Sequence, residues 1–366
     1  QQQSSTKRRF KVLYFNHGFG ANSLSWLPAI PALTDRLGAR VGLAHDAVGF
    51  GFTELAIRSN QPSYPAANGE NNANQSMHDG QEDHNGNDES DLYQFTSSAK
   101  IGLELIRRAS SSSTSTSTSS RAVNANGSSA HSDTDTNDEP VALFGHSMGS
   151  IATLHMALNL PKSTPKTVVL VAPALGLQPT STTAAATTAR GDATPNRAKS
   201  AFQRLRSKLR GSVFDPTASY VLRRVVGKQG FWRRGLTFCW ADPKNKLSQS
   251  SVIAFMWPSI LQGWEGGILN FARAASNRQG YSDEELVQRV LALPNTSVHV
   301  IYSADDPVIR PSIVERTFAK YKHLDNLNLV KLEGVGHDPF EEDTDGFVRT
   351  VEDMLSASAD DGTQNN

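Results

Sequence analysis

Hydrophobic residues along the chain follow two patterns that alternate. Short apolar runs typical of buried strands are followed by stretches in which apolar residues recur at helical spacing. Strands are predicted at Lys11–Phe15, Arg40–Ala44, Val141–Phe144, Thr167–Val171, Ser297–Tyr302 and Leu327–Leu332. Helices are predicted at Leu27–Leu37, Tyr93–Ala109, Met148–Leu160, Asp283–Leu293, Pro311–Tyr321 and Phe340–Ser356. This alternation predicts an α/β fold with a mostly parallel sheet and helices on both of its faces.

Polar segments of low complexity interrupt the alternation. Residues 60–90 are rich in Asn, Gly, Asp and Ser, and residues 110–139 contain the run SSSSTSTSTSS. Both hold too few apolar residues to offset the entropy of ordering the chain, so we expect disordered surface insertions there and a disordered tail at 359–366. The acidic piece His78–Asp91 is expected to be a solvated loop and not a metal site, because no fixed scaffold would hold its ligands.

Residues 177–280 follow neither pattern and are predicted to be a cap inserted into a core made of 1–176 and 281–358. Eleven Lys and Arg residues between Arg197 and Arg234 face only one acidic residue, Asp215. A solvated basic helix is the expectation there, with a weak peripheral contact to anionic lipid or to an anionic substrate as the alternative. Several large side chains of this region would either line an acyl pocket or form a core for the cap itself: Trp232, Trp240, Phe255, Met256, Trp257 and Trp264.

Composition narrows the class of protein. The 366 residues contain 36 Lys and Arg and 36 Asp and Glu, and this balance gives no support to nucleic acid as a partner. Cys239 is the only cysteine, which excludes an internal disulfide and a cysteine-rich metal site; we expect it to be buried in the cap. No apolar run reaches eighteen residues, and the start QQQSSTKRRFKVLYF lacks a signal-type segment, so an intracellular protein is favoured.

The strongest chemical signal follows the third predicted strand. The sequence Gly145-His146-Ser147-Met148-Gly149 has the form G-x-S-x-G and lies between a buried strand and a helix. A serine on such a sharp turn projects its hydroxyl outward, and Gly145 and Gly149 leave room where the neighbouring backbone comes close. Ser147 is therefore the predicted nucleophile.

The other groups that acyl transfer needs lie after other predicted strands. His337, on a glycine-flanked loop after the last strand, is the candidate base, and Asp306 or Asp305 is the candidate acid that orients it. The N–H groups of Phe19 and Met148 are the candidate donors for the oxyanion. Because functional residues of a parallel sheet lie on loops at the carboxyl ends of its strands, these groups are expected to meet.

Six segments, in this order, resemble the α/β-hydrolase superfamily in its HG-type branch: NHGFGANSLSW, HDAVGFGFT, GHSMGS, VAPAL, SADDPV and GVGHDPFEE. The sequence is also similar to plant and fungal hydrolases of unassigned substrate in GFGANSLSW and GWEGGILNF. The resemblance favours Asp306 over Asp305, because the acid is the last residue of the family's G-x-x-D pattern, although Ser303 replaces the glycine. It also implies a hairpin before the first strand, which is missing, so either the chain is a fragment or the sheet lacks an edge.

Other polar residues near these motifs are expected to have supporting roles. Asp46 is expected to fix the turn before Gly49 through hydrogen bonds to backbone N–H groups. His17 is expected to order the loop that contains Gly18, and no role is assigned to His146.

Together the motifs predict a serine hydrolase that cleaves a carboxylic ester, with a hydrophobic or lipid-like acyl group favoured. No metal or organic cofactor is required for this chemistry. A thioesterase, a carbon–carbon bond hydrolase and an acyltransferase use the same residues, and a non-hydrolytic module that binds a small ligand is the alternative of a different class.

Overall fold

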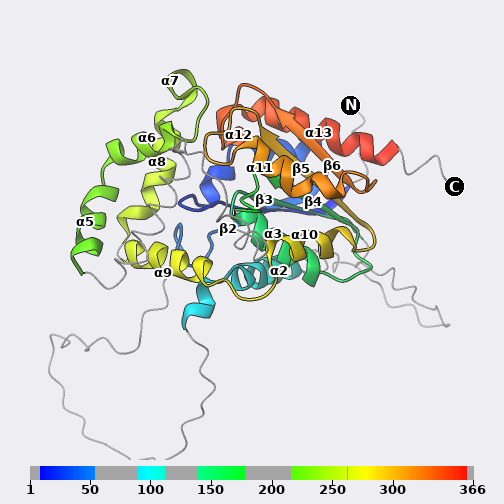
Figure 1. Ribbon diagram of the computed structural model, residues 1–366, viewed down its shortest axis with the longest axis horizontal. Helices are drawn as coiled ribbons and strands as arrows, with labels where there is room; N and C mark the ends of the chain where they lie inside the picture. Colours follow the sequence, from blue (N-terminus) through cyan, green and yellow to red (C-terminus); the bar gives the residue numbers. More distant parts are fainter. Residues whose placement is uncertain (1–8, 54–88, 112–138, 178–215, 262, 361–366) are drawn as a thin grey trace, which may run out of the picture.

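A six-stranded sheet forms the centre of the protein, seen in a computed structural model that describes residues 9–53, 89–111, 139–177, 216–261 and 263–360 (Figure 1). All neighbouring strands are parallel, in the order β2-β1-β3-β4-β5-β6. The strands are β1 (Phe10–Asn16), β2 (Ala39–His45), β3 (Val141–His146), β4 (Lys166–Val171), β5 (Thr296–Ser303) and β6 (Leu327–Leu332). All six predicted strands and the parallel α/β fold are confirmed.

Residues that alternate along the strands face two separate hydrophobic layers. On β1, Val12 and Tyr14 pack into one layer, while Leu13 and Phe15 pack into the other, as the two-residue period of a strand requires. The first layer lies under α2 (Phe95–Ser111), α3 (Gly149–Asn159), α10 (Asp283–Leu291) and α11 (Pro311–Phe318). The second lies under α1 (Ile30–Arg36) and α13 (Thr344–Asp360), and Figure 1 shows α13 on the opposite side of the sheet from α3 and α10.

Two predicted helices differ in their boundaries. The helix predicted at Leu27–Leu37 begins only at Ile30, after the 3-10 helix η1 (Ser23–Trp26), and has a proline in its first turn. The helix predicted at Phe340–Ser356 is divided into α12 (Pro339–Glu342) and α13. Asp343 divides it, because its backbone leaves the helical region and its carboxylate accepts from the Gly346 N–H of the next helix.

The predicted insertions and tail lie almost wholly outside the described residues, and their described ends are helical. Helix α2 runs to Ser111, one residue beyond the start predicted for the second insertion, and α13 runs to Asp360. Among the described residues no strand precedes β1, which lies inside the sheet between β2 and β3. The sheet edge on that side is therefore β2, whose residues are mostly half-buried.

Of the predicted cap, residues 177, 216–261 and 263–280 are described, and most of them are helical. Its elements are α5 (Pro216–Val226), α6 (Gln229–Thr237), α7 (Pro243–Lys246), α8 (Gln249–Met256), the 3-10 helix η4 (Trp257–Ile260) and α9 (Trp264–Ser276). Figure 1 shows these helices beside one end of the sheet, next to the turn between β3 and α3. Within the residues that the structure describes, no helix is both long and apolar enough to cross a membrane.

Candidate active site

Ser147 occupies the turn between β3 and α3 in a strained conformation. Its φ of 51° lies in the left-handed region, which costs free energy for a residue with a side chain. Neighbouring strands hold this conformation, because the Ser147 N–H donates to Val171 O at 2.9 Å and the Ser147 carbonyl accepts from the Ala174 N–H at 3.1 Å. A Cβ added at Gly149 would stand 2.4 Å from His17 O, so only glycine allows this approach of the two loops.

His337 and Asp306 are brought together from the ends of β6 and β5. The His337 Nδ1–H donates to Asp306 Oδ2 at 2.8 Å, and both side chains are buried. The second carboxylate oxygen of Asp306 accepts from the N–H groups of Val308 (2.7 Å) and Ile309 (2.8 Å), which fixes the plane of the carboxylate. Asp305 is exposed and accepts from the Gly334 N–H instead. The geometry thus leaves His337 Nε2 available to a nucleophile.

The imidazole of His337 lies beside the elbow. Its ring centroid is 4.7 Å from the ring of His146, the residue directly before Ser147, and His146 Nε2–H donates to His337 O at 3.0 Å. Burial lowers the pKa of His337, but the charge and hydrogen bond of Asp306 and the charge of Asp338 more than offset it, so this pKa is raised above its ordinary value. His146 itself is held neutral, because burial lowers its pKa strongly.

The loop after β1 lies against the elbow. A Cβ added at Gly18 would stand 3.0 Å from Ser147 Cβ and 2.9 Å from His146 Nδ1. The backbone N–H groups of Phe19 and Met148 flank this contact, and neither makes a hydrogen bond to another described residue. Both donors are free to bind an oxyanion.

His17 and Asp46 hold this loop in place. His17 Nδ1–H donates to Gly18 O (2.8 Å), and His17 Nε2 accepts from the Ala47 N–H (3.0 Å), so the ring is neutral; burial lowers its pKa. The Asp46 carboxylate accepts from the Ser23 N–H (2.6 Å) and the Phe52 N–H (2.7 Å), and thereby joins the turn after β2 to a second loop. Both side chains order backbone through these hydrogen bonds.

Several polar groups around the site were not singled out in the sequence. Asp338 is buried next to His337, and burial raises its pKa to about 6 although the charge of His337 opposes this. Glu342 is also buried and accepts from backbone N–H groups only. Both belong to the segment GVGHDPFEE, but nothing in their spacing distinguishes a buried carboxylate from the exposed ones of a helix. Within the described residues, no cluster of His, Cys, Asp and Glu is suited to hold a metal ion.

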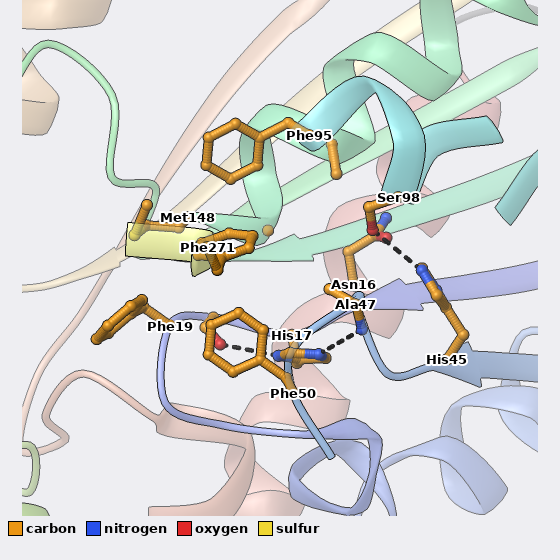
Figure 2. A pocket seen from close by; sticks show the side chains of 13 residues that line it. Asn16, His17, Phe19, His45, Ala47, Phe50, Phe95, Ser98, Met148 and Phe271 are labelled. Atoms are coloured by element: carbon orange, nitrogen blue, oxygen red, sulfur yellow. Dashed lines mark hydrogen bonds between the residues drawn. The ribbon is translucent and has the colours of Figure 1, made fainter. Parts of the chain in front are cut away.

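A small cavity of about 20 Å³ is lined in part by the Gly18–Phe19 loop (Figure 2). One side of the cavity is lined by four phenylalanine rings: Phe19, Phe50, Phe95 and Phe271. The rings that contact one another have centroids 4.6–6.2 Å apart. The other side is polar: His45 binds the hydroxyls of Tyr14 (2.6 Å) and Ser98 (3.0 Å), and Asn16 lies beside them. The full lining is Asn16, His17, Gly18, Phe19, His45, Ala47, Phe50, Phe95, Ser98, Met148, Gly149, Ala152 and Phe271. A space of this volume holds about one water molecule.

The large cap side chains singled out in the sequence do not line this cavity, whereas Phe271, on the cap helix α9, does. Trp232, Trp240, Phe255 and Trp264 are buried in a cluster of their own, in which the rings of Trp232 and Trp264 meet at 5.8 Å. Trp257 instead faces solvent with 53% of its surface exposed. The observed packing therefore matches the alternative in which these residues form the core of the cap. Cys239, expected to be buried there, is only partly buried.

Comparison with known proteins places this geometry in a family. The sequence matches the model of the alpha/beta hydrolase family over residues 13–350. A search of curated proteins finds no sequence relative. Similar solved structures include a bromoperoxidase from Bacillus anthracis, with a TM-score of 0.55 and 14% identity over 95% of this chain and 92% of the other.

Two further structures are similar to the same extent. An esterase from Exiguobacterium antarcticum has a TM-score of 0.54 and 14% identity, covering 94% of this chain and 92% of the other. A 2-hydroxy-6-oxo-6-phenylhexa-2,4-dienoate hydrolase from Rhodococcus sp. strain RHA1 has a TM-score of 0.53 and 16% identity, covering 96% and 92%. At such low identity these likenesses support the fold alone. Since the family model spans almost the whole sequence, the chain belongs to the alpha/beta hydrolase family.

Proposed function

We propose that the protein hydrolyses carboxylic esters with Ser147 as nucleophile, His337 as base and Asp306 as the acid that orients the base. The observation that carries this proposal is the pairing of His337 Nδ1 with a fully buried Asp306, next to a serine held at a φ of 51° on a strand-to-helix turn. Strain of this kind persists only where the surroundings enforce it, and it is concentrated at functional sites.

In the first half of the reaction, the Ser147 hydroxyl attacks the ester carbonyl while His337 Nε2 takes its proton. The charge that develops on the carbonyl oxygen is stabilised by the N–H groups of Phe19 and Met148. Asp306 keeps the His337 proton on Nδ1 and stabilises the imidazolium. The tetrahedral intermediate then collapses, the alcohol leaves with the proton from His337, and the acyl group stays on Ser147.

In the second half, His337 takes a proton from water, whose oxygen attacks the acyl-enzyme. The acid is released as His337 returns the proton to Ser147. A thioester or an activated carbon–carbon bond would pass through the same steps, and an acyltransferase would use another alcohol in place of water. An ester is proposed because an alkoxide leaving group requires the proton that His337 supplies, whereas a thiolate leaves without it.

We further propose that the acyl group enters the cavity lined in part by the Gly18–Phe19 loop. Phe19 and Met148, the proposed oxyanion donors, also line this cavity, and Met148 directly follows Ser147, which supports the placement of the acyl group there. The rings of Phe50 and Phe271, whose centroids are 4.6 Å apart, narrow it, and a volume of about 20 Å³ accommodates little more than a methyl group. A short hydrophobic acyl group is therefore favoured, and a lipid-like chain would require these rings to move.

The experiment is turnover of a short aryl ester by the wild-type protein and by Ser147→Ala. Loss of at least about a thousandfold in kcat is expected, because the covalent step is removed while binding and the oxyanion donors remain. A fluorophosphonate probe followed by peptide mapping should place the adduct on Ser147. An adduct on a different serine, or equal turnover by the variant, would refute the assignment. Matched aryl ester, thioester and β-diketone substrates then separate the three bond types.

A further inference from the structure

We propose that Glu342 is a positioning residue, whose carboxylate ties the loop of the base His337 to the cap. This inference rests on the proposed function, since it concerns how the base is held. It adds that the cap takes part in placing the base, through a contact that none of the proposed catalytic groups makes.

Glu342 joins two parts of the chain that are about a hundred residues apart in sequence. One carboxylate oxygen accepts from the N–H of Gly336, on the loop that carries His337 (the base loop). The same oxygen accepts from the N–H of Ala241, on the cap, at 3.1 Å. The other oxygen accepts from the Asp242 N–H at 2.7 Å. The side chain is 6% exposed, so three backbone donors stabilise a carboxylate that would otherwise lose its hydration uncompensated.

The cap turn whose backbone N–H groups bind Glu342 also forms a hydrogen bond with the backbone of His337. The His337 N–H donates to Cys239 O at 2.6 Å, while the His337 carbonyl accepts from His146 Nε2 at 3.0 Å. The turn and the loop are in such close contact that a Cβ at Gly336 would stand 2.1 Å from Cys239 O. The main chain of His337 is thus held between the cap on one side and the residue before Ser147 on the other.

This arrangement makes the position of the His337 ring depend on the cap turn. The ring must reach both Asp306 and the Ser147 hydroxyl, and a displacement of about 1 Å at such a group costs on the order of a hundredfold in rate. Gly336 and Gly334 make the base loop flexible, and Gly334 has a φ of 69°. Asp305, Lys246 and Ser303 bind this loop at Gly334 and Val335, and the Glu342 carboxylate adds the anchor at Gly336, the residue directly before His337.

A second contact between the same two segments provides the control. Ser251, on α8, donates through its hydroxyl to Glu341 at 2.8 Å, and this bond involves neither Gly336 nor His337. Burial raises the pKa of Glu341 to about 8, although the Ser251 hydrogen bond opposes the shift. Ser251→Ala therefore removes one hydrogen bond between cap and base loop but leaves the backbone of the base anchored.

The experiment compares the full-length wild-type protein with Glu342→Gln and Ser251→Ala on a short aryl ester, with active sites titrated by fluorophosphonate. A glutamine has only one acceptor oxygen, so its NH₂ group faces a backbone N–H in place of the other oxygen. The hydrogen bonds made by that oxygen of Glu342 are therefore lost. Glu342→Gln is expected to lower kcat about 10- to 100-fold with KM within about threefold, whereas Ser251→Ala keeps kcat within about twofold. Hydrogen exchange at the Gly336 and His337 amides should rise in Glu342→Gln only.

Each outcome decides the proposal. A Glu342→Gln kcat within twofold of wild type, or an equal loss in Ser251→Ala, would overturn it, because the carboxylate would then be one structural contact among several. If Glu342→Gln fails to fold, Glu342→Asp keeps the charge but shortens the reach by one methylene, and the same criteria apply. If the wild type cleaves no ester, the proposed function fails; the exchange rates at Gly336 and His337 still report whether Glu342 anchors the loop.

Discussion

Replacing Asp306 with Asn tests the proposed pairing of acid and base most directly. In the wild-type protein one oxygen of Asp306 accepts from His337 Nδ1, and the other accepts from the N–H groups of Val308 and Ile309. An asparagine has one acceptor oxygen for these two sets of donors. The two backbone donors are fixed, so the amide oxygen is expected to face them and the amide NH₂ to face His337.

The magnitude of the effect follows from the proton on His337. An NH₂ group opposite Nδ1 favours the tautomer with the proton on Nε2, the nitrogen that has to accept a proton from Ser147. The same exchange in a well-studied serine protease lowers kcat about 10⁴-fold. The two bound backbone donors make the amide orientation here at least as strict, so we expect a loss of about 10³- to 10⁴-fold, or about 4–5.5 kcal/mol in activation free energy.

The assay is kcat and kcat/KM for a short aryl ester across pH, with Asp305→Asn as the matched control. Asp305 is exposed and accepts only from the Gly334 N–H, which an amide oxygen does equally well, so its variant should keep kcat within about twofold. In the wild type the pKa of His337 is raised, so activity should fall as pH drops through a midpoint above about 6.5. Removing the Asp306 charge should shift that midpoint to lower pH. A larger loss in Asp305→Asn, or an unchanged midpoint in Asp306→Asn, would refute the reasoning.

Two further predictions concern the substrate and the cap. Phe271→Ala should enlarge the cavity and shift the best acyl length to longer chains. The kcat/KM should rise about fourfold for each methylene that becomes buried. An unchanged chain-length profile would exclude the cavity as the acyl site. The cap carries eight Lys and Arg residues against two Asp and Glu residues between 216 and 276, and it exposes Trp257 (53%) and Ile260 (51%). We propose that this surface binds anionic vesicles, so co-sedimentation should weaken in high salt and in Trp257→Ala; binding that is indifferent to lipid charge would contradict this.

The sequence predicts the sheet well because the sheet depends on local signals, and the residues of the proposed triad follow its strands. An apolar run such as Val141–Phe144, buried on both faces, has few alternatives to a central strand, and Gly149 is dictated by the approach of His17 O. Parallel register then brings the ends of β1, β3 and β4 together, since Asn16 pairs with Gly145 and His146 with Val171. Residues that follow these strands must meet, whatever the connecting segments contain.

Contacts between distant segments could not be predicted in the same way. In the sequence, Glu342 is one of several acidic residues at the start of a helix. Only the fold shows that its carboxylate faces the N–H groups of Ala241 and Asp242. The sequence assigns no role to His146, because the direction of this side chain depends on the left-handed turn at Ser147. That turn places its ring 4.7 Å from His337. Both cases depend on backbone donors and acceptors, which side-chain identity does not reveal.

The cap shows why an aromatic pattern cannot by itself separate a binding surface from a core. A helical layer outside the main sheet needs a hydrophobic cluster of its own, and here Trp232, Trp240 and Trp264 supply it. The rings beside the proposed oxyanion donors are different ones: Phe19 from the loop after β1, and Phe271 from the cap helix α9. Since α9 contributes Trp264 to the cap cluster and Phe271 to the cavity, displacement of α9 would disturb both. The proposed acyl cavity and the core of the cap are thereby coupled through one helix.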